Sequence, residues 1–475
     1  MEQNRNKKLL KDIVLYGIGN LGGKVVTFVL ALVYTFFIKP ENMGYYNTAI
    51  TTICLLLPFV NLQLRESVFR FLIDNHDEHH RNAVISHSYR LILGMMTVIS
   101  LCFMAVSAFV TIRCGYYILG LLLTWALYEV QLQIVRGLGH TRFFVVYGLI
   151  AALLMVVFSA VFVIFLKWNI EGLFIANILA RLLIILHIEI KFSIIRNSFT
   201  SRRREPEVTG MLLKFSGPLI LVTTCMWMMG QSYIYFINYF YGYYEAGLFS
   251  TAFKFSVIIE MIAVVVFQAW QETSILQFHS KDRDRYYSSV LNAYLLLLTG
   301  IVITLSFVLK SLYGKIVEAE YTGGIVYLYV LCVAQIGYAL QAFVGALFYA
   351  QKNTVQMLYI TLVSSIAGLL SYYLLIRHAG LTGIAIAYGV TFFFLFICYL
   401  IWTRKTVKIS FSVRTIVLSA LVLTGGGIIF YQTEHVLWRI LYWGICMIAL
   451  YLAFPKKIVS DIKKIVSDIK KSVLK

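Results

Sequence analysis

The chain has 475 residues, of which 60% are hydrophobic and only 13% are charged. A water-soluble protein could not cover this much apolar surface, because about half apolar is already usual for a globular domain. The formal charge of +19 could suggest nucleic acid, but the basic residues flank long apolar runs and form no binding stripe of their own. The composition therefore predicts an all-α, polytopic membrane protein, with no nucleic-acid partner.

Apolar runs long enough to cross a bilayer as helices recur along the whole sequence, since a span needs about 20 residues. We expect about fourteen transmembrane helices on this criterion. They are placed near residues 13–38, 43–63, 86–111, 115–135, 143–166, 171–195, 211–238, 243–268, 287–310, 323–350, 354–376, 380–402, 412–431 and 435–454. An even number of spans puts both termini on one side of the membrane.

Basic residues divide unequally between the two sets of connections. One set, together with the two tails, carries most of the lysines and arginines, including the SRRREPE segment that starts at Ser201. The opposite set holds only Lys39, Arg113, Lys167, Lys310, Lys315, Arg377 and Arg439. Cytoplasmic loops are enriched in lysine and arginine. We therefore expect a multi-pass protein of the cell inner (cytoplasmic) membrane, with both termini in the cytoplasm.

The two halves of the sequence resemble each other in the same order. GYYNTA from Gly44 matches GLFSTA from Gly247, and GLFIANILA from Gly172 matches GIAIAYGV from Gly383. A third pair, GHTRFFVVY and QKNTVQMLY, is related by a similar offset of about two hundred residues. Parallel repeats of this kind are typical of transporters in which two helix bundles rock about the substrate.

The repeat predicts the domain organisation. An N-terminal lobe of six helices covers residues 1–200, a cytoplasmic loop covers 201–210, and a C-terminal lobe of six helices covers 211–405. Two further helices lie in 406–455. The tail, 456–475, contains KKIVSDI twice and is expected to form a basic amphipathic helix suited to an anionic leaflet.

Three basic residues, Lys24, Arg181 and Lys254, lie well inside predicted spans. A charge at this depth is costly, so it usually faces a cavity or a partner. Lys24 also shares a helical stripe with Asn20. Such cations suit an anionic cargo such as a diphosphate, whose oxygens accept charge-assisted hydrogen bonds. The alternative is that each cation snorkels to the interface or pairs with an acidic side chain of the protein.

The fourth predicted span carries Glu129, Gln133 and Arg136 on one face, near its cytoplasmic end. These residues either form a gate or headgroup contact, or they include an ordinary structural pair of Glu129 with Arg136. Glu260 is the lone acid deep in the eighth span. It could carry a coupling proton or sodium ion, or it could neutralise a neighbouring cation.

Arg65, Glu66 and Arg70 close the second predicted span at its cytoplasmic end. Arg65 is a candidate contact for an incoming diphosphate, because arginine binds phosphate oxygens strongly. Anchoring of the helix end by positive charge explains the two arginines equally well.

Five short motifs, taken in their order along the chain, resemble the multidrug/oligosaccharidyl-lipid/polysaccharide (MOP) exporter superfamily, and within it the polysaccharide or O-antigen flippase branch (Wzx-like). They are YGIGNLGGK in the first span, MGYYNTA in the second, the VRGLGHTR connection, FSGPLIL in the seventh span and GLTGIAIAYG in the twelfth. The resemblance covers nearly the whole chain. It implies a V-shaped pair of lobes, alternating access, and an undecaprenyl-diphosphate-linked oligosaccharide as cargo for surface polysaccharide biosynthesis. The other partners to consider are membrane lipids and a polysaccharide polymerase, and a monomer is plausible for such folds.

Two other functions compete with the flippase. A cation-coupled multidrug exporter resembles it in fold but typically places a carboxylate in the middle of the first helix, where this chain has Lys24. A membrane polysaccharide polymerase or glycosyltransferase needs an extended catalytic region, whereas every predicted loop here is short. The sequence has no GxxxxGK[ST] loop for hydrolysing ATP. We therefore expect a flippase rather than an enzyme, without catalytic residues, cofactor or metal.

Overall fold

The computed structural model describes residues 30, 33–74, 77–194, 196, 206–276, 278, 280, 282–351 and 354–454. These ranges are helical almost throughout and contain no strand. Eleven of their helical segments are long and apolar enough to span a membrane. Two of these, Glu207–Val264 and Val355–Thr403, have 58 and 49 residues, more than twice the length that a bilayer needs. The protein is thus an all-α, multi-pass membrane protein, as the sequence predicts; most of the first expected span lies outside the described residues.

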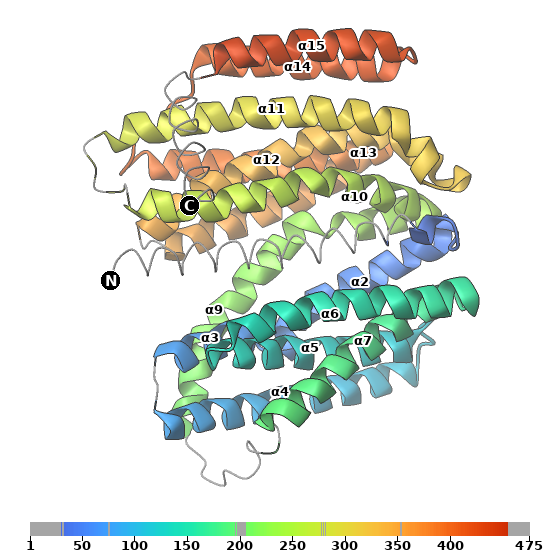
Figure 1. Cartoon of the computed structure of the whole chain (residues 1–475), viewed down its shortest axis with the longest axis vertical. Coiled ribbons are helices and arrows are strands. Elements are labelled where there is room, and N and C mark those ends of the chain that lie inside the picture. The colour runs from blue at the N-terminus through green and yellow to red at the C-terminus, as the bar shows by residue number, and fades with distance from the viewer. Residues whose placement is uncertain are drawn as a thin grey trace, which may run out of the picture. The chain divides into compact units, whose positions relative to one another are not determined.

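The chain divides into two compact units between Gly247 and Leu248. The first unit runs from blue to green in Figure 1. Its described elements are α2 (Pro40–Val60), α3 (Leu64–Asp74), α4 (Glu78–Ser107), α5 (Gly115–Gly137), α6 (Thr141–Ser159), the π-helix η1 (Ala160–Phe165), α7 (Asn169–Phe192), α9 (Pro206–Gly230) and the start of α10 (Tyr233–Leu276). Helix α5 packs against α2, α3, α4, α6 and α7, so it forms the centre of this unit.

A tight connection between α2 and α3 shapes the site described below. Helix α2 ends one residue before Asn61, whose side-chain oxygen accepts a hydrogen bond from the Gln63 backbone N–H at 2.9 Å. Leu62 and Gln63 both have positive φ values, 51° and 50°. Non-glycine residues rarely adopt this conformation, and such strain concentrates at functional sites. The turn fixes the direction in which the first residues of α3 project.

The second unit contains the rest of α10 and the elements that follow it. These are α11 (Arg283–Ile316), the 3-10 helix η2 (Ala319–Gly324), α12 (Ile325–Ala350), α13 (Thr354–Thr403), α14 (Val413–Gln432) and α15 (Val436–Ala453). Helices α12 and α13 pack along each other, while α14 and α15 form a pair beside α11 (Figure 1). The label α13 covers two helices joined across a kink at Ala379 and Gly380, and Gly380 has a φ of 58° that glycine adopts without steric cost.

Apolar side chains cover the outer faces of both units. Ile190 in α7 is 82% exposed, and Leu437 and Leu452 in α15 are 74% and 69% exposed. Exposing such apolar side chains to water is unfavourable, whereas contact with lipid tails is not. The exposed apolar surface therefore agrees with a chain that is surrounded by a bilayer.

Candidate functional site

Seven of the nine residues that the sequence singles out lie within the described ranges. The first unit holds Arg65, Glu129, Gln133, Arg136 and Arg181, and the second unit holds Lys254 and Glu260. Asn20 and Lys24 lie outside the described residues, so their expected role stays a prediction.

Glu129 on α5 is the centre of a polar network inside the first unit. Its side chain is only 18% exposed. The carboxylate accepts hydrogen bonds from the Trp125 indole N–H at 3.2 Å and from the Asn61 side-chain amide at 3.0 Å. It also pairs with Arg65, whose Nη1 lies 3.5 Å from Glu129 Oε1. One carboxylate thus ties the end of α2 and the start of α3 to α5.

Arg181 on α7 approaches the same network from the other side. Its Nη1 donates to the backbone oxygen of Asn177 at 3.1 Å and to the side-chain oxygen of Asn177 at 2.7 Å. The guanidinium lies over the Trp125 ring, 4.3 Å from the ring centroid, and its charge attracts Glu129. Arg181 Nε is buried without a hydrogen-bond partner among the described residues. Trp125 therefore contacts the anion through its N–H and the cation through its ring face.

We call this set the Glu129 cluster; it comprises Asn61, Arg65, Trp125, Glu129, Asn177 and Arg181. A pocket of about 380 Å³ lies beside Arg65, between α3 and α9 of the first unit. It is lined by Gln63, Arg65, Glu66, Phe69, Arg70, Phe215, Leu219, Val222 and Thr223. Its volume lies within the range usual for small-molecule sites. We call it the Arg65 pocket.

The polar rim of the Arg65 pocket is held in place from both sides. Gln63 Nε2 donates to Thr223 Oγ1 at 2.7 Å, which joins the strained turn to α9. Arg65 Nε lies 3.2 Å from a carboxylate oxygen of Glu66. Arg136 of α5 places its guanidinium 4.0 Å from the centroid of Phe69, which lines the pocket. The pocket therefore has fixed polar groups as well as apolar walls.

The site carries a surplus of positive charge. The Glu129 cluster, the Arg65 pocket and Arg136 together contain four arginines, at positions 65, 70, 136 and 181, and two glutamates, at positions 66 and 129. Arginines thus outnumber glutamates by two among these named side chains. Such a surplus at the end of an apolar bundle favours an anionic ligand, because the membrane around it cannot screen the charge as water does.

Gln133, the third residue of the predicted face on α5, has a buried side-chain oxygen without a hydrogen-bond partner among the described residues. In the second unit, Lys254 on α10 is half-buried, and within the described ranges it has no hydrogen bond or ion pair. Glu260, on the same helix, interacts with the Tyr338 hydroxyl of α12. Lys254 thus remains a candidate for contact with an anionic cargo.

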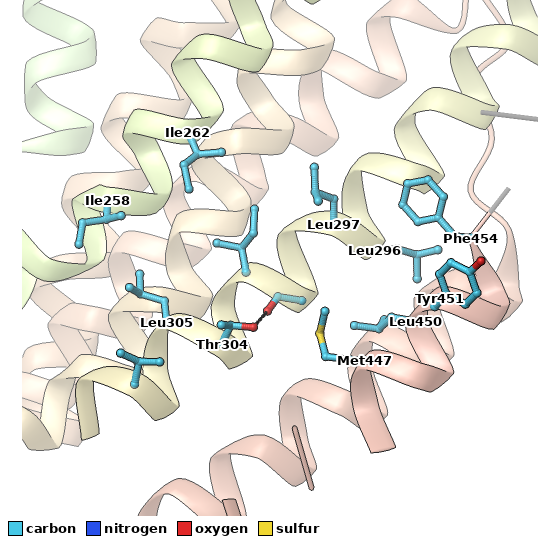
Figure 2. Close-up of a pocket in the computed structure, with 13 residues that line it drawn as sticks. Ile258, Ile262, Leu296, Leu297, Thr304, Leu305, Met447, Leu450, Tyr451 and Phe454 are labelled. Carbon is cyan, nitrogen blue, oxygen red and sulfur yellow. Dashed lines mark hydrogen bonds between the residues drawn. The ribbon is translucent and has the colours of Figure 1, made fainter. Parts of the chain in front are cut away.

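A second, apolar pocket of about 460 Å³ lies among α10, α11 and α15 of the second unit. Figure 2 shows Leu296 and Leu297 of α11 facing Met447 and Leu450 of α15 across it. Its few polar side chains include Thr304, whose hydroxyl donates to the backbone oxygen of Gly300 at 2.7 Å. The lining suits a hydrocarbon chain and offers nothing to a phosphate or a sugar.

Sequence reasoning does not single out Asn61 and Trp125 of the Glu129 cluster, whereas Asn177 lies one helical turn before Arg181. Trp125 lies one turn before Glu129 on the same helix face, and this spacing could have indicated the contact. Asn61 could not have been found in this way, because its contact with Glu129 joins residues that are 68 positions apart.

Residues 9–271 match the family described as "Polysaccharide biosynthesis protein". This match covers more than half of the 475 residues. The chain belongs to this family. The resemblance to the polysaccharide flippase branch of the MOP superfamily is thereby confirmed.

Several solved structures share the fold of this chain. The lipid II flippase MurJ, in an inward closed conformation, has a TM-score of 0.66 and 13% identity, with 94% of this chain and 99% of that chain covered. An inward-facing multidrug resistance transporter of the MATE family has a TM-score of 0.64 and 15% identity, with 82% of this chain and 97% of that chain covered. A MOP superfamily transporter from Pyrococcus furiosus, described as having a binding pocket of reverse polarity, has a TM-score of 0.60 and 16% identity, with 83% of this chain and 95% of that chain covered.

No curated protein sequence matches the chain. The family and the shared fold establish a transporter of the MOP type that crosses the membrane many times. At these identities the structural likeness describes the fold and leaves the cargo open.

Proposed function

We propose that this member of the polysaccharide biosynthesis protein family is a flippase for a polyprenyl-diphosphate-linked oligosaccharide. It moves this lipid across the cytoplasmic membrane by alternating access, and the glycan then serves surface polysaccharide synthesis. The observation that carries the proposal is the Arg65 pocket beside the Glu129 cluster, where Arg65, Arg70 and Arg181 lie with two glutamates.

The chemistry of a lipid diphosphate supports this choice of cargo. A diphosphate has several anionic oxygens on neighbouring phosphorus atoms, and arginine offers a planar fork of N–H donors that matches them. Arg65 and Arg70 line the pocket, and Arg181 has one donor without a partner in the described chain. A diphosphate that enters the pocket could therefore exchange the Arg65–Glu66 contact for a stronger one.

The nature of the walls supports a glycan on the diphosphate. Gln63 and Thr223 present amide and hydroxyl groups at the pocket, and Phe69 and Phe215 present aromatic faces. Sugars bind proteins through this combination of directed hydrogen bonds and apolar contact. The second unit adds Lys254 as a further cation.

The remaining expectations belong to the same proposal. Two lobes, in residues 1–200 and 211–405, would alternate about the cargo, and both termini would lie in the cytoplasm. Arg136 would contact the cargo, and Glu129, Gln133 and Glu260 would act in gating or ion coupling. A polysaccharide polymerase would receive the flipped lipid.

The proposal is tested by deleting the gene in its host and measuring the polyprenyl-diphosphate oligosaccharide that accumulates. Wild type should clear the lipid, whereas Arg65→Gln and Arg181→Gln, expressed equally, should leave it in place. The matched control is Arg113→Gln, because Arg113 lies just before α5 at the end opposite Arg136 and bonds Asn42 there at 2.8 Å. It should clear the lipid as wild type does.

A deletion strain that accumulates no lipid intermediate but becomes sensitive to cationic drugs would overturn the flippase. That outcome would favour the cation-coupled multidrug exporter of the same superfamily.

A further inference from the structure

Arg439, in the first turn of α15, is a buried cation whose hydrogen-bonding capacity is mostly unused. The residue is 5% exposed. Its Nη2 donates to the backbone oxygen of Glu434 at 3.2 Å. Nε and Nη1 are buried and have no partner in the described part of the chain. Arginines are almost never this buried unless they are paired, because an uncompensated charge in a low-dielectric site is costly.

The neighbouring acid does not neutralise Arg439. The Glu434 carboxylate pairs with Lys310 of α11, 3.2 Å from Lys310 Nζ, and points outward with 85% of its side chain exposed. Lys310 also lies over the ring of Phe430, 5.2 Å from its centroid. Lys310, Arg439 and Glu434 thus leave one positive charge. Because Arg439 is in the first turn of α15, the partial positive charge of the helix N-terminus adds to it.

The side chain of Arg439 lines a pocket of about 380 Å³ between α11 and α15. The other lining residues are Thr304, Phe307, Val308, Ser311, Leu312, Val436, Ile440 and Trp443. The Trp443 indole donates to Thr304 Oγ1 at 2.9 Å. Val436 and Ile440 are more than half exposed, so the rim of the pocket faces the lipid.

This pocket continues into the apolar pocket of Figure 2. Thr304 and Val308 line both of them, and both lie between α11 and α15. From Arg439 to Leu450, which lines the far pocket, the helix rises about 16 Å. The two pockets therefore form one groove with a cation at one end and a hydrocarbon lining along the rest, and the length suits an acyl chain. We call it the α11–α15 groove.

We propose that the α11–α15 groove holds an anionic phospholipid of the bilayer, with its phosphate on Arg439 and an acyl chain in the apolar pocket. A free phosphate would leave the apolar part empty, and a zwitterionic lipid would bring its own cation beside Lys310 and Arg439. The groove thus favours a ligand that has both a negatively charged headgroup and an acyl chain. The groove belongs to the second unit and shares no residue with the Arg65 pocket of the first, so the proposal does not depend on which substrate the protein carries.

The test uses the purified full chain in detergent, depleted of lipid, with titration of phosphatidylglycerol, phosphatidylcholine, polyprenyl phosphate or inorganic phosphate. Binding is followed by native mass spectrometry and by the apparent melting temperature. Phosphatidylglycerol should bind and stabilise wild type, and Arg439→Gln should weaken its binding about tenfold, as the loss of charge-assisted hydrogen bonds predicts. Arg377→Gln, which removes an exposed arginine at the bend of α13, should bind it as wild type does.

Arg439→Lys guards against a folding defect, because it keeps the charge but loses the fork of donors. It should bind phosphatidylglycerol with an affinity between those of wild type and Arg439→Gln. Equal binding by wild type and Arg439→Gln would overturn the site. Equal affinity for phosphatidylcholine, or tighter binding of inorganic phosphate or polyprenyl phosphate than of phosphatidylglycerol, would overturn the choice of ligand.

Discussion

Replacing Glu129 with glutamine should destabilise the first unit far more than the same change at Glu66. The two side chains both pair with Arg65, at 3.5 Å and 3.2 Å. They differ in surroundings, since Glu129 is largely buried and also accepts from Asn61 and Trp125, whereas Glu66 is 46% exposed. The comparison therefore isolates the effect of the buried network.

The cost follows from the geometry. Glutamine can keep one acceptor oxygen for Trp125, but its amide then faces the Asn61 amide, donor against donor. Asn61 cannot turn over to adapt, because its oxygen accepts the Gln63 N–H at 2.9 Å. A lost hydrogen bond to a buried charge costs about 1.5–3 kcal/mol, and the partly exposed ion pair adds roughly 0.5 kcal/mol. We expect the free energy of unfolding to fall by about 2–3.5 kcal/mol for Glu129→Gln and by about 0.5 kcal/mol or less for Glu66→Gln.

The assay is thermal unfolding of the purified protein in one detergent, with wild type and both variants at equal concentration. For a unit of this size, 1 kcal/mol corresponds to about 2–4 °C in melting temperature. Glu129→Gln should therefore melt about 4–14 °C below wild type, and Glu66→Gln within about 2 °C of it. Equal shifts in the two variants would refute the reasoning, because the network around Glu129 would then contribute nothing.

Three further predictions concern packing, the helix bend and transport. Trp270→Ala should lower the free energy of unfolding by about 3–5 kcal/mol, because the indole is buried and its ring centroid lies 4.1 Å from that of Phe343 in α12. Thermal unfolding measures this loss, and a loss below about 1 kcal/mol would show that the stack is dispensable. Gly383→Ala should lower the yield of folded protein, because its Cβ would overlap the carbonyl oxygen of Leu375, whereas Gly444→Ala, with open space around it, should not; similar yields would contradict this packing. Arg181→Lys should fold but clear less lipid intermediate in the deletion strain, because lysine cannot both bond Asn177 and lie flat on the indole; full clearance would mean that charge alone suffices.

The sequence alone predicts the fold class because hydropathy is a local property. An apolar run such as 115–135 must be a span wherever it lies, and helix α5 (Gly115–Gly137) begins and ends within two residues of it. The spans expected at 354–376 and 380–402 likewise correspond to the two helices that α13 joins across a kink at Ala379 and Gly380. Hydropathy does not indicate the backbone conformation at such a kink, where Gly380 has a φ of 58°.

The sequence predicts the charged residues of the candidate site but not the side chains that contact them. Depth in the membrane singles out Arg181, and its position on a helix singles out Glu129. What connects them is the Trp125 side chain, and no sequence pattern says which face of α7 meets α5. Arg439 is a residue that the sequence does not single out, because it is only one of the few basic residues in the less basic set of connections. Its burial and its unused donors become visible only once α15 packs on α11.

The central claim is that the protein itself moves a lipid diphosphate oligosaccharide, and reconstitution tests it most directly. Purified protein is placed in vesicles with a labelled polyprenyl-diphosphate oligosaccharide, and a glycan-cleaving enzyme added outside measures the fraction that reaches the outer leaflet. The account predicts transfer well above protein-free vesicles, with Arg65→Gln and Arg181→Gln slower by about tenfold and Arg113→Gln unchanged. Transfer no faster than in protein-free vesicles, or transfer unaffected in both of the first two variants, would contradict it.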